Sequence, residues 1–311
     1  MTDLRPMSLG EILDRAFQIY RSCFLAFIGI AVLPFIVQMA LVLVGFPLNG
    51  LVRQTTLSVS VQAAIIDGYH WIASRFSSDF LGFAIWPAFC AFAAQIVMRQ
   101  QCTIADILKG LRIRWRGLLA IAVLFWLLES EAPRLLHNTS LLWRPWHTMP
   151  FWLSFIISPV EAFALIAPLV LGLPIWTIER QTVTVSLGRS WTLSRGAYGR
   201  IFITCVLQSV AIWSIALSTR AILSLAFYLA GREHFSGLVR WVWIFLPDYT
   251  ASIFAAPLLP IAITLIYYDQ RIRREGFDIE WMMGAAGMVA SIQVPALAAD
   301  GMGAPGEEMP R

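Results

Sequence analysis

The stretch Ile263–Glu280, which reads ITLIYYDQRIRREGFDIE, constrains the fold of this chain more than any other segment. A long apolar run ends in Tyr267 and Tyr268, and three arginines follow within the next six residues. A transmembrane helix leaves the bilayer in this way, with aromatic side chains at the interface and arginines in the cytosol. The segment therefore predicts a membrane helix whose carboxyl end is cytosolic.

The composition agrees with a chain embedded in lipid. Of the 311 residues, 58% are hydrophobic and only 14% are charged, whereas a soluble domain has about 25% charged residues. A spanning helix needs about 20 apolar residues, and the chain contains apolar runs for about six crossings. The net charge is only +4, and no basic run is interleaved with aromatic residues, so we expect no nucleic acid partner.

Three segments, 8–23, 103–116 and 186–200, share one pattern. In each, a hydroxyl residue caps a short amphipathic helix, basic residues follow, and an apolar run begins; Ser8 with Glu11 predicts a capping box in the first. The predicted apolar faces comprise Leu9, Ile12, Leu13, Ala16, Phe17 and Tyr20 in the first segment, and Leu187, Trp191 and Tyr198 in the third. We expect three amphipathic surface helices on the cytosolic side and a threefold repeat of a surface helix with a helical hairpin.

The fold class predicted is all-α, a polytopic membrane protein with about six transmembrane helices and both termini in the cytosol. With this threading, most of the 23 lysines and arginines lie in cytosolic segments, as the positive-inside rule requires. Asn49 and Gly50 predict a turn after the first span. Residues 1–283 form the predicted helical membrane domain, and residues 284–311 a disordered cytosolic tail. Four of the expected spans comprise residues 24–46, 80–97, 153–178 and 249–268, and the other two, the third and the fifth, begin at residues 117 and 201.

Three stretches resemble one known family: LRPMSLGEILDRAFQIYR at 4–21, SLGRSWTLSRGAYGR at 186–200 and LIYYDQRIRREGFDIEW at 265–281. They are similar to the bacterial membrane proteins grouped as the glycerophosphoryl diester phosphodiesterase membrane domain family, above all in the closing motif YYDxRIRxEGFD. The resemblance implies a six-span helical domain in a bacterial inner membrane. We expect no phosphodiesterase activity, because these residues contain no counterpart of the catalytic domain fused to some members. No functional residue is carried over from the family.

The sequence contains no motif for enzyme chemistry: no HExxH, no GxSxG, no phosphate-binding loop and no paired-cysteine metal motif. Its four cysteines predict no disulfide framework. The four histidines fall in predicted outer segments together with Asp67, Glu131 and Glu233, but none has the spacing of a zinc ligand pair. The prediction is a protein that is not an enzyme and that carries no metal and no cofactor.

Two groups of residues are candidate sites. Tyr268, Asp269, Arg271 and Arg273 lie at the cytosolic edge and could contact an anionic lipid head group. The alternative for this group is a topology anchor.

The second group is Glu129 with Glu161. Glu129 follows the third apolar run, and Glu161 lies eight residues into the fourth span, about 12 Å deep at the helical rise. If the third helix continues through Glu129, the two carboxylates would lie at similar depth on the two arms of one hairpin, as an intramembrane polar site. In the alternative, the third span ends at Leu128 and Glu129 is in water.

Two functions fit these features. The first is a scaffold in the inner membrane that organises lipid or a partner protein, favoured by the surface helices and by the lack of a substrate site. The second is a transporter-like module for a lipid-related or small polar solute. Prolines in the late spans and the internal repeat favour it. Membrane lipids are the expected partners in both.

Overall fold

The computed structural model describes residues 5–74, 76, 80–98, 104–128, 166–229 and 237–276, and in these residues every regular element is a helix. All-α architecture is therefore confirmed. The elements are α1 (Leu9–Ser22), α2 (Phe24–Arg53), α3 (Val59–Ser74), α4 (Leu81–Val97), α5 (Ile104–Ile113), α6 (Trp115–Trp126), α9 (Gly172–Ile178), α10 (Val183–Ser194), α11 (Tyr198–Leu229), α12 (Gly237–Ala255) and α13 (Leu258–Glu275).

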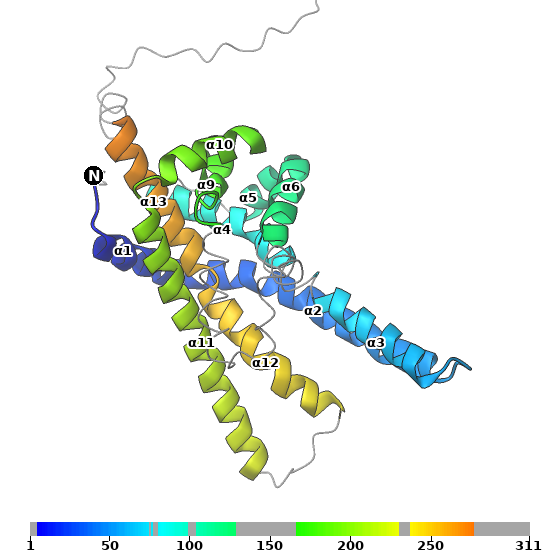
Figure 1. Ribbon diagram of the computed structural model, residues 1–311. Helices are drawn as coiled ribbons and strands as arrows, with labels where there is room; N and C mark the ends of the chain where they lie inside the picture. Colours follow the sequence, from blue (N-terminus) through cyan, green and yellow to red (C-terminus); the bar gives the residue numbers. More distant parts are fainter. Residues whose placement is uncertain are drawn as a thin grey trace, which may run out of the picture.

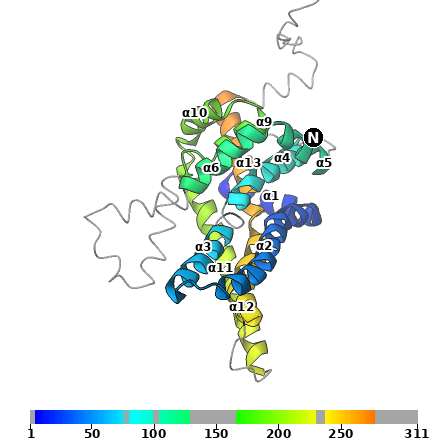
Figure 2. The same cartoon turned by 90° about the vertical axis from the view of Figure 1, so that its right-hand side faces the viewer.

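Helix α13 lies at the centre of a cluster of shorter helices, and two long helix pairs extend away from it (Figure 1). It packs against α1, α4, α9, α10 and α11. One extended pair consists of α2 and α3 and the other of α11 and α12, and both pairs can be followed in the second view (Figure 2). The apolar core fills the space around α13, and its largest fully buried side chains are Trp176, Tyr267, Tyr268, Phe27, Phe89 and Phe125.

Three helices in the described part of the chain are long and apolar enough to cross a membrane. They are Phe24–Arg53, Tyr198–Leu229 and Leu246–Glu275, of which the last combines the end of α12 with α13. Two shorter apolar helices, Leu81–Val97 and Trp115–Trp126, accompany them. Most of α2 and α11 is exposed, whereas most of the segment Leu246–Glu275 is buried. This arrangement is compatible with a membrane protein.

Helix α1 begins as the sequence predicts. The Ser8 hydroxyl accepts a hydrogen bond from the Glu11 backbone N–H, and the Glu11 carboxylate accepts one from the Ser8 N–H at 2.7 Å. These two bonds satisfy donors that the first turn of a helix leaves free. The predicted apolar face is wrong in one respect: Phe17 is 63% exposed, and Ile19 is buried in its place. Packing against α13 selects the stripe Ile12, Ala16, Ile19 and Tyr20.

The difference between the two faces of α1 can be measured. Ile12 is completely buried, so Ile12→Val should lower the free energy of unfolding by about 1 kcal/mol through the cavity that it leaves. Phe17→Leu, on the exposed face, should change it by less than about 0.5 kcal/mol. Thermal unfolding of the two purified variants in one detergent compares them. Equal losses of stability would mean that α1 is rotated relative to this description.

Helix α2 is longer than predicted, because Asn49 and Gly50 lie inside it rather than in a turn. The chain turns instead at residues 54–58. There the Gln62 side chain donates hydrogen bonds to the carbonyls of Thr55 and Leu57, both at 3.1 Å. The sequence Asn-Gly shows only that the backbone at these two residues can adopt a turn conformation. The turn forms later in the chain, where Gln62 in the first turn of α3 bonds the carbonyls of the turn residues.

Two predicted spans are interrupted. The described part of the fourth has a turn at residues 167–171 before α9 begins at Gly172. The last span breaks at Ala256 and Pro257 between α12 and α13. Proline lacks the N–H that a continuous helix needs, which explains why both breaks occur where the sequence has proline.

The carbonyls exposed by the second break are bonded by side chains from other helices. The Tyr20 hydroxyl donates to the carbonyl of Phe254, and the Gln208 amide donates to that of Ala255, both at 2.7 Å. The break between α12 and α13 is therefore held by α1 and α11.

Candidate functional site

The candidate site is the charged carboxyl end of α13, where the organising stretch of the sequence meets the other helices. Leu259–Gln270 is buried throughout, and the helix ends at Gly276, whose backbone has φ 66° and ψ 32°. This left-handed conformation suits glycine, and the Gly276 N–H bonds back to the carbonyl of Ile272. The last turn, Arg271–Glu275, thus leaves the core with its charged groups near α1, α10 and the start of α11.

Asp269 joins three segments that are far apart in the sequence. Its side chain is completely buried and accepts hydrogen bonds from the Met7 backbone N–H and from Nε of Arg273, both at 2.8 Å. It also forms an ion pair with Arg200 at the start of α11. Arg273 donates a second hydrogen bond to the carbonyl of Met7, at 3.0 Å. A buried carboxylate needs partners of this kind to offset its desolvation, so Asp269 fixes the entrances of α1 and α11 against α13.

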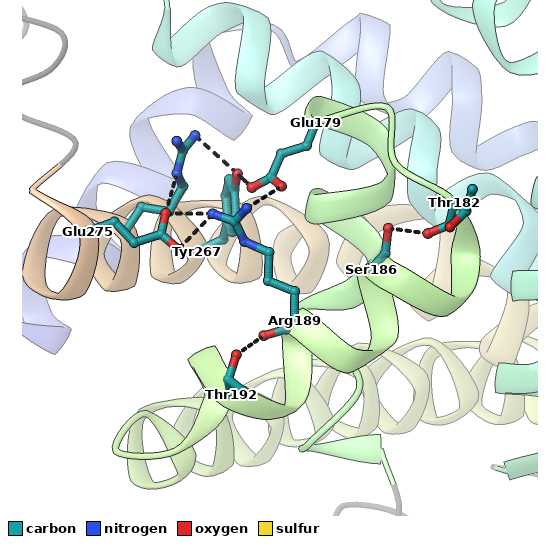
Figure 3. Close-up of polar contacts among 8 residues, drawn as sticks. Glu179, Thr182, Ser186, Arg189, Thr192, Tyr267 and Glu275 are labelled. Atoms are coloured by element: carbon teal, nitrogen blue, oxygen red, sulfur yellow. Dashed lines mark hydrogen bonds and ion pairs between the residues drawn. The ribbon is translucent and has the colours of Figure 1, made fainter.

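A second network surrounds Tyr267 (Figure 3). The Tyr267 hydroxyl donates to Glu179 at 2.6 Å, and Glu179 forms an ion pair with Arg189 at 2.9 Å. Arg189 also pairs with Glu275 at 2.6 Å, and Glu275 accepts from Nε of Arg271 at 3.0 Å. Arg271 completes the ring through the Tyr267 hydroxyl at 3.4 Å. The network connects the end of α9, the middle of α10 and the last two turns of α13.

Helix α10 rests on its neighbours through serines, which corrects the apolar face predicted for it. Ser186, Ser190 and Ser194 are fully buried, whereas Trp191 is 48% exposed. The hydroxyls of Ser190 and Ser194 donate to the carbonyl of Pro168, at 2.9 and 3.3 Å. Small hydroxyl side chains allow α9 and the turn before it to approach α10 closely.

The ends of α10 also differ from the prediction. The helix begins after Thr182 rather than at Ser186. At its other end, Arg274 donates to the carbonyl of Thr192 at 2.7 Å. The next residues include Gly196, with φ 91°, a value that L side chains rarely adopt. The turn Arg195–Ala197 therefore leads from α10 into α11, and the end of α10 beside it is bonded by an arginine of α13.

Arg114 performs a similar function at the break between α5 and α6. Its guanidinium donates to the carbonyls of Trp176 and Gln181, at 2.8 and 2.7 Å, and lies 4.3 Å from the centroid of the Trp176 ring. Burial lowers the pKa of Arg114, and the nearby charge of Arg180 lowers it further. The Trp176 carbonyl in the last turn of α9 thus receives a positive partner, which suits the carboxyl end of a helix.

A further ion pair lies far from this cluster, on the other part of α11 and on α12. Arg220 contacts Asp248 at 3.4 Å. Arg200 and Arg220 are twenty positions apart on α11, about 30 Å at 1.5 Å per residue. Asp269 and Asp248, their respective partners, are separated by a similar length of α12 and α13.

The structure brings all four residues of the predicted head-group site together at the end of α13, but it turns two of them inward. Tyr268 is 1% exposed and Asp269 is completely buried, so both are covered by protein. Arg271 and Arg273 are partly exposed and bonded to Glu275 and Asp269. The predicted intramembrane pair, Glu129 and Glu161, lies outside the described residues, as do residues 284–311.

The sequence prediction missed Glu179, Arg189 and Arg200, the partners that come from other helices. Spacing along α13 offered a partial signal, since 267, 271 and 275, and likewise 269 and 273, share a face at i, i+4 intervals. No such signal exists for residues that precede their bonded partners on α13 by 69 or more positions.

Within the described ranges there is no cluster of three or more His, Cys, Asp or Glu residues that could hold a metal ion. Cys23, Cys90 and Cys205 are free thiols. The carboxylates at the end of α13 are paired with arginines, so their charge serves to hold helices together.

Comparison with known proteins gave no relative: neither a family model, nor a curated protein, nor a solved structure matches this chain. The resemblance to the glycerophosphoryl diester phosphodiesterase membrane domain family therefore stays a prediction from the motifs quoted above.

Proposed function

We propose that this chain is a non-enzymatic scaffold in a bacterial inner membrane, where it organises lipid or a partner protein. The observation that carries the proposal is the pairing of α11 with α12 and α13. Two ion pairs, Arg200 with Asp269 and Arg220 with Asp248, stand at the ends of a long apolar surface. This geometry suits a bilayer, and the polar side chains of Gln208 and Ser209 on α11 donate hydrogen bonds to carbonyls of the protein.

The spacing of the two ion pairs supports a transmembrane position. No Asp, Glu, Lys or Arg lies between Arg200 and Arg220 or between Asp248 and Asp269. The interval of about 30 Å on α11 equals the thickness of the hydrocarbon core. Charged pairs at both edges of that core avoid the cost of burying charge in lipid. Large apolar side chains exposed on α11 in this interval are Phe202, Ile203, Val206, Leu207, Val210, Trp213 and Leu217.

The charge distribution supports an orientation. The end of the molecule that contains Asp269 carries Arg189, Arg195 and Arg200, and the last turn of α13 adds three more arginines. At the other ion pair, Arg220 is balanced by Asp248. The positive-inside rule assigns the arginine-rich end to the cytosol, which places α1 and α10 on the cytosolic side.

The proposal includes six spans, namely the three long apolar helices, α4, α6 and the predicted fourth span. It also includes the threefold repeat. In support of the repeat, α1 meets α2 at Cys23 with φ −124° and ψ 33°, and α5 meets α6 at Arg114 with φ −102° and ψ 28°. Both joints are a single residue of similar conformation. The joint after α10 is longer, because it contains Arg195–Ala197.

A transporter-like module is the second candidate, and the breaks at 167–171 and at Ala256 and Pro257 favour it, since discontinuous helices form transporter sites. Against it, the carbonyls of Phe254 and Ala255 accept hydrogen bonds from Tyr20 and Gln208. The break is thus stabilised by protein groups, as a permanent bend would be.

Reconstitution distinguishes the two candidates. The purified protein in liposomes should give no flux of small polar solutes above that of protein-free liposomes, in a swelling assay with glycerol, amino acids and glycerophosphodiesters. When it is extracted from cells in polymer-bounded membrane discs, lipid or a partner protein should be enriched relative to bulk membrane. Saturable solute flux would reject the scaffold in favour of the transporter.

A further inference from the structure

The three short helices that precede apolar helices each leave a large apolar side chain exposed next to an exposed arginine. On α1 these are Phe17 and Arg21. At α10 they are Trp191 and Arg195, the first residue after the helix, and in both pairs the two residues are four positions apart. At the end of α5, Ile113 is 81% exposed directly after the exposed Arg112. We call these three pairs the basic anchors.

The arginines of the basic anchors differ from those that hold the core. Arg21, Arg112 and Arg195 form no ion pair within the described part of the chain, in contrast to Arg189 and Arg200. They therefore present uncompensated positive charge to their surroundings.

The acidic residues nearby do not cancel this charge. Residues 5–22 contain three arginines, Arg5, Arg15 and Arg21, against two carboxylates, Glu11 and Asp14, and Glu11 pairs with Arg5 at 2.5 Å. Helix α5 contains Lys109 and Arg112 against the single Asp106. Helix α10 contains no acidic residue. The free charge on this end of the molecule is thus positive.

Each basic anchor lies beside the joint that leads into an apolar helix. Arg21 is two residues before Cys23, Arg112 is two residues before Arg114, and Arg195 is itself the first residue after α10. If these apolar helices cross the bilayer, as the proposed function requires, the joints lie at its cytosolic edge. Trp115, 56% exposed at the start of α6, adds an aromatic side chain of the kind found at that depth.

From this placement we infer that the basic anchors form a binding surface for anionic phospholipids of the cytosolic leaflet. Arginine matches the phosphate of a head group in charge and hydrogen bonding, and the adjacent apolar side chain enters the acyl boundary. Helices α1, α5 and α10 lie around one end of the molecule rather than in one patch, as both views show (Figures 1 and 2). A lipid annulus can meet all three sites at once, whereas one acidic protein would have to surround the molecule.

The test measures lipid retained by the full-length protein. Purified protein is equilibrated with micelles of a neutral detergent that contain equal phosphatidylglycerol and phosphatidylcholine, and the bound phospholipids are quantified by mass spectrometry. The wild type should retain phosphatidylglycerol preferentially. Each change among Arg21→Gln, Arg112→Gln and Arg195→Gln should lower that preference by up to about fivefold, and high salt should weaken it.

The control is the triple variant with lysine at the same three positions, which keeps the charges and should keep the preference. Thermal unfolding without lipid should be the same for the lysine, glutamine and wild-type proteins, because these side chains are exposed. An unchanged ratio of bound phosphatidylglycerol to phosphatidylcholine after all three arginines are replaced by glutamine would overturn the inference. So would a wild type that shows no lipid preference but co-purifies with an acidic protein through the same arginines. Solute flux would instead reject the scaffold and leave the lipid ratio unaffected.

Discussion

Replacing Asp269 by asparagine is expected to lower the free energy of unfolding by about 3 kcal/mol, the lower end of the range for breaking a buried ion pair. Asparagine has nearly the same shape, but it lacks the charge that Arg200 and Arg273 share. The lower end applies because both arginines are partly exposed and regain some hydration. Thermal unfolding of the purified variant in detergent measures the loss.

A second measurement locates the effect. The Met7 amide donates to Asp269, so hydrogen exchange at Met7 should accelerate in the Asp269→Asn variant while the middle of α4 stays protected. Asp14→Asn is the matched control, because Asp14 is exposed and bonded only within α1, to Gln18. It should cost less than about 0.5 kcal/mol. Equal stability of the two variants would show that Asp269 does not hold the helices together.

Alanine at Gly117 is expected to destabilise the protein by about 2 kcal/mol, within the range for overpacking a core. A Cβ atom there would lie 2.9 Å from Cζ2 and Nε1 of Trp176. The indole is completely buried and lies under the Arg114 guanidinium, so it has little freedom to move away. The glycine is thus required by close packing between α6 and α9.

Gly110 provides a control of opposite sign seven residues earlier. It is exposed in α5, and nothing lies within 4 Å of a Cβ atom built on it. Alanine is the better helix former, so Gly110→Ala should raise stability by up to about 1 kcal/mol. Thermal unfolding of both variants compares them directly. A stabilised or unchanged Gly117→Ala protein would contradict the packing of Trp176 described above.

The parts of the fold that follow from local chemistry could be predicted from the sequence. Ser8 and Glu11 start α1 because each needs only the other and three residues of backbone. The change along α13 from tyrosines to arginines could likewise be predicted, because it occurs between consecutive turns of a single helix. Helical class and apolar character follow in the same way, because they depend on the composition of each segment.

Orientation and pairing could not be predicted, because they depend on which surfaces meet. The spacing of apolar residues along each segment made Phe17 and Trp191 expected inner residues, but the structure exposes both and buries Ile19 and the serines of α10 instead. A serine satisfies its hydroxyl on a carbonyl only once that carbonyl is brought near, as Pro168 is for Ser190. The same holds for the predicted head-group site. Its arginines predict positive charge at the membrane edge. Only the packing of α1 and α11 against α13 buries Asp269 and pairs it with Arg200. Local signals specify what each segment can form, and the packing of distant segments selects the partner, since a side chain's environment comes from helices far away in the chain.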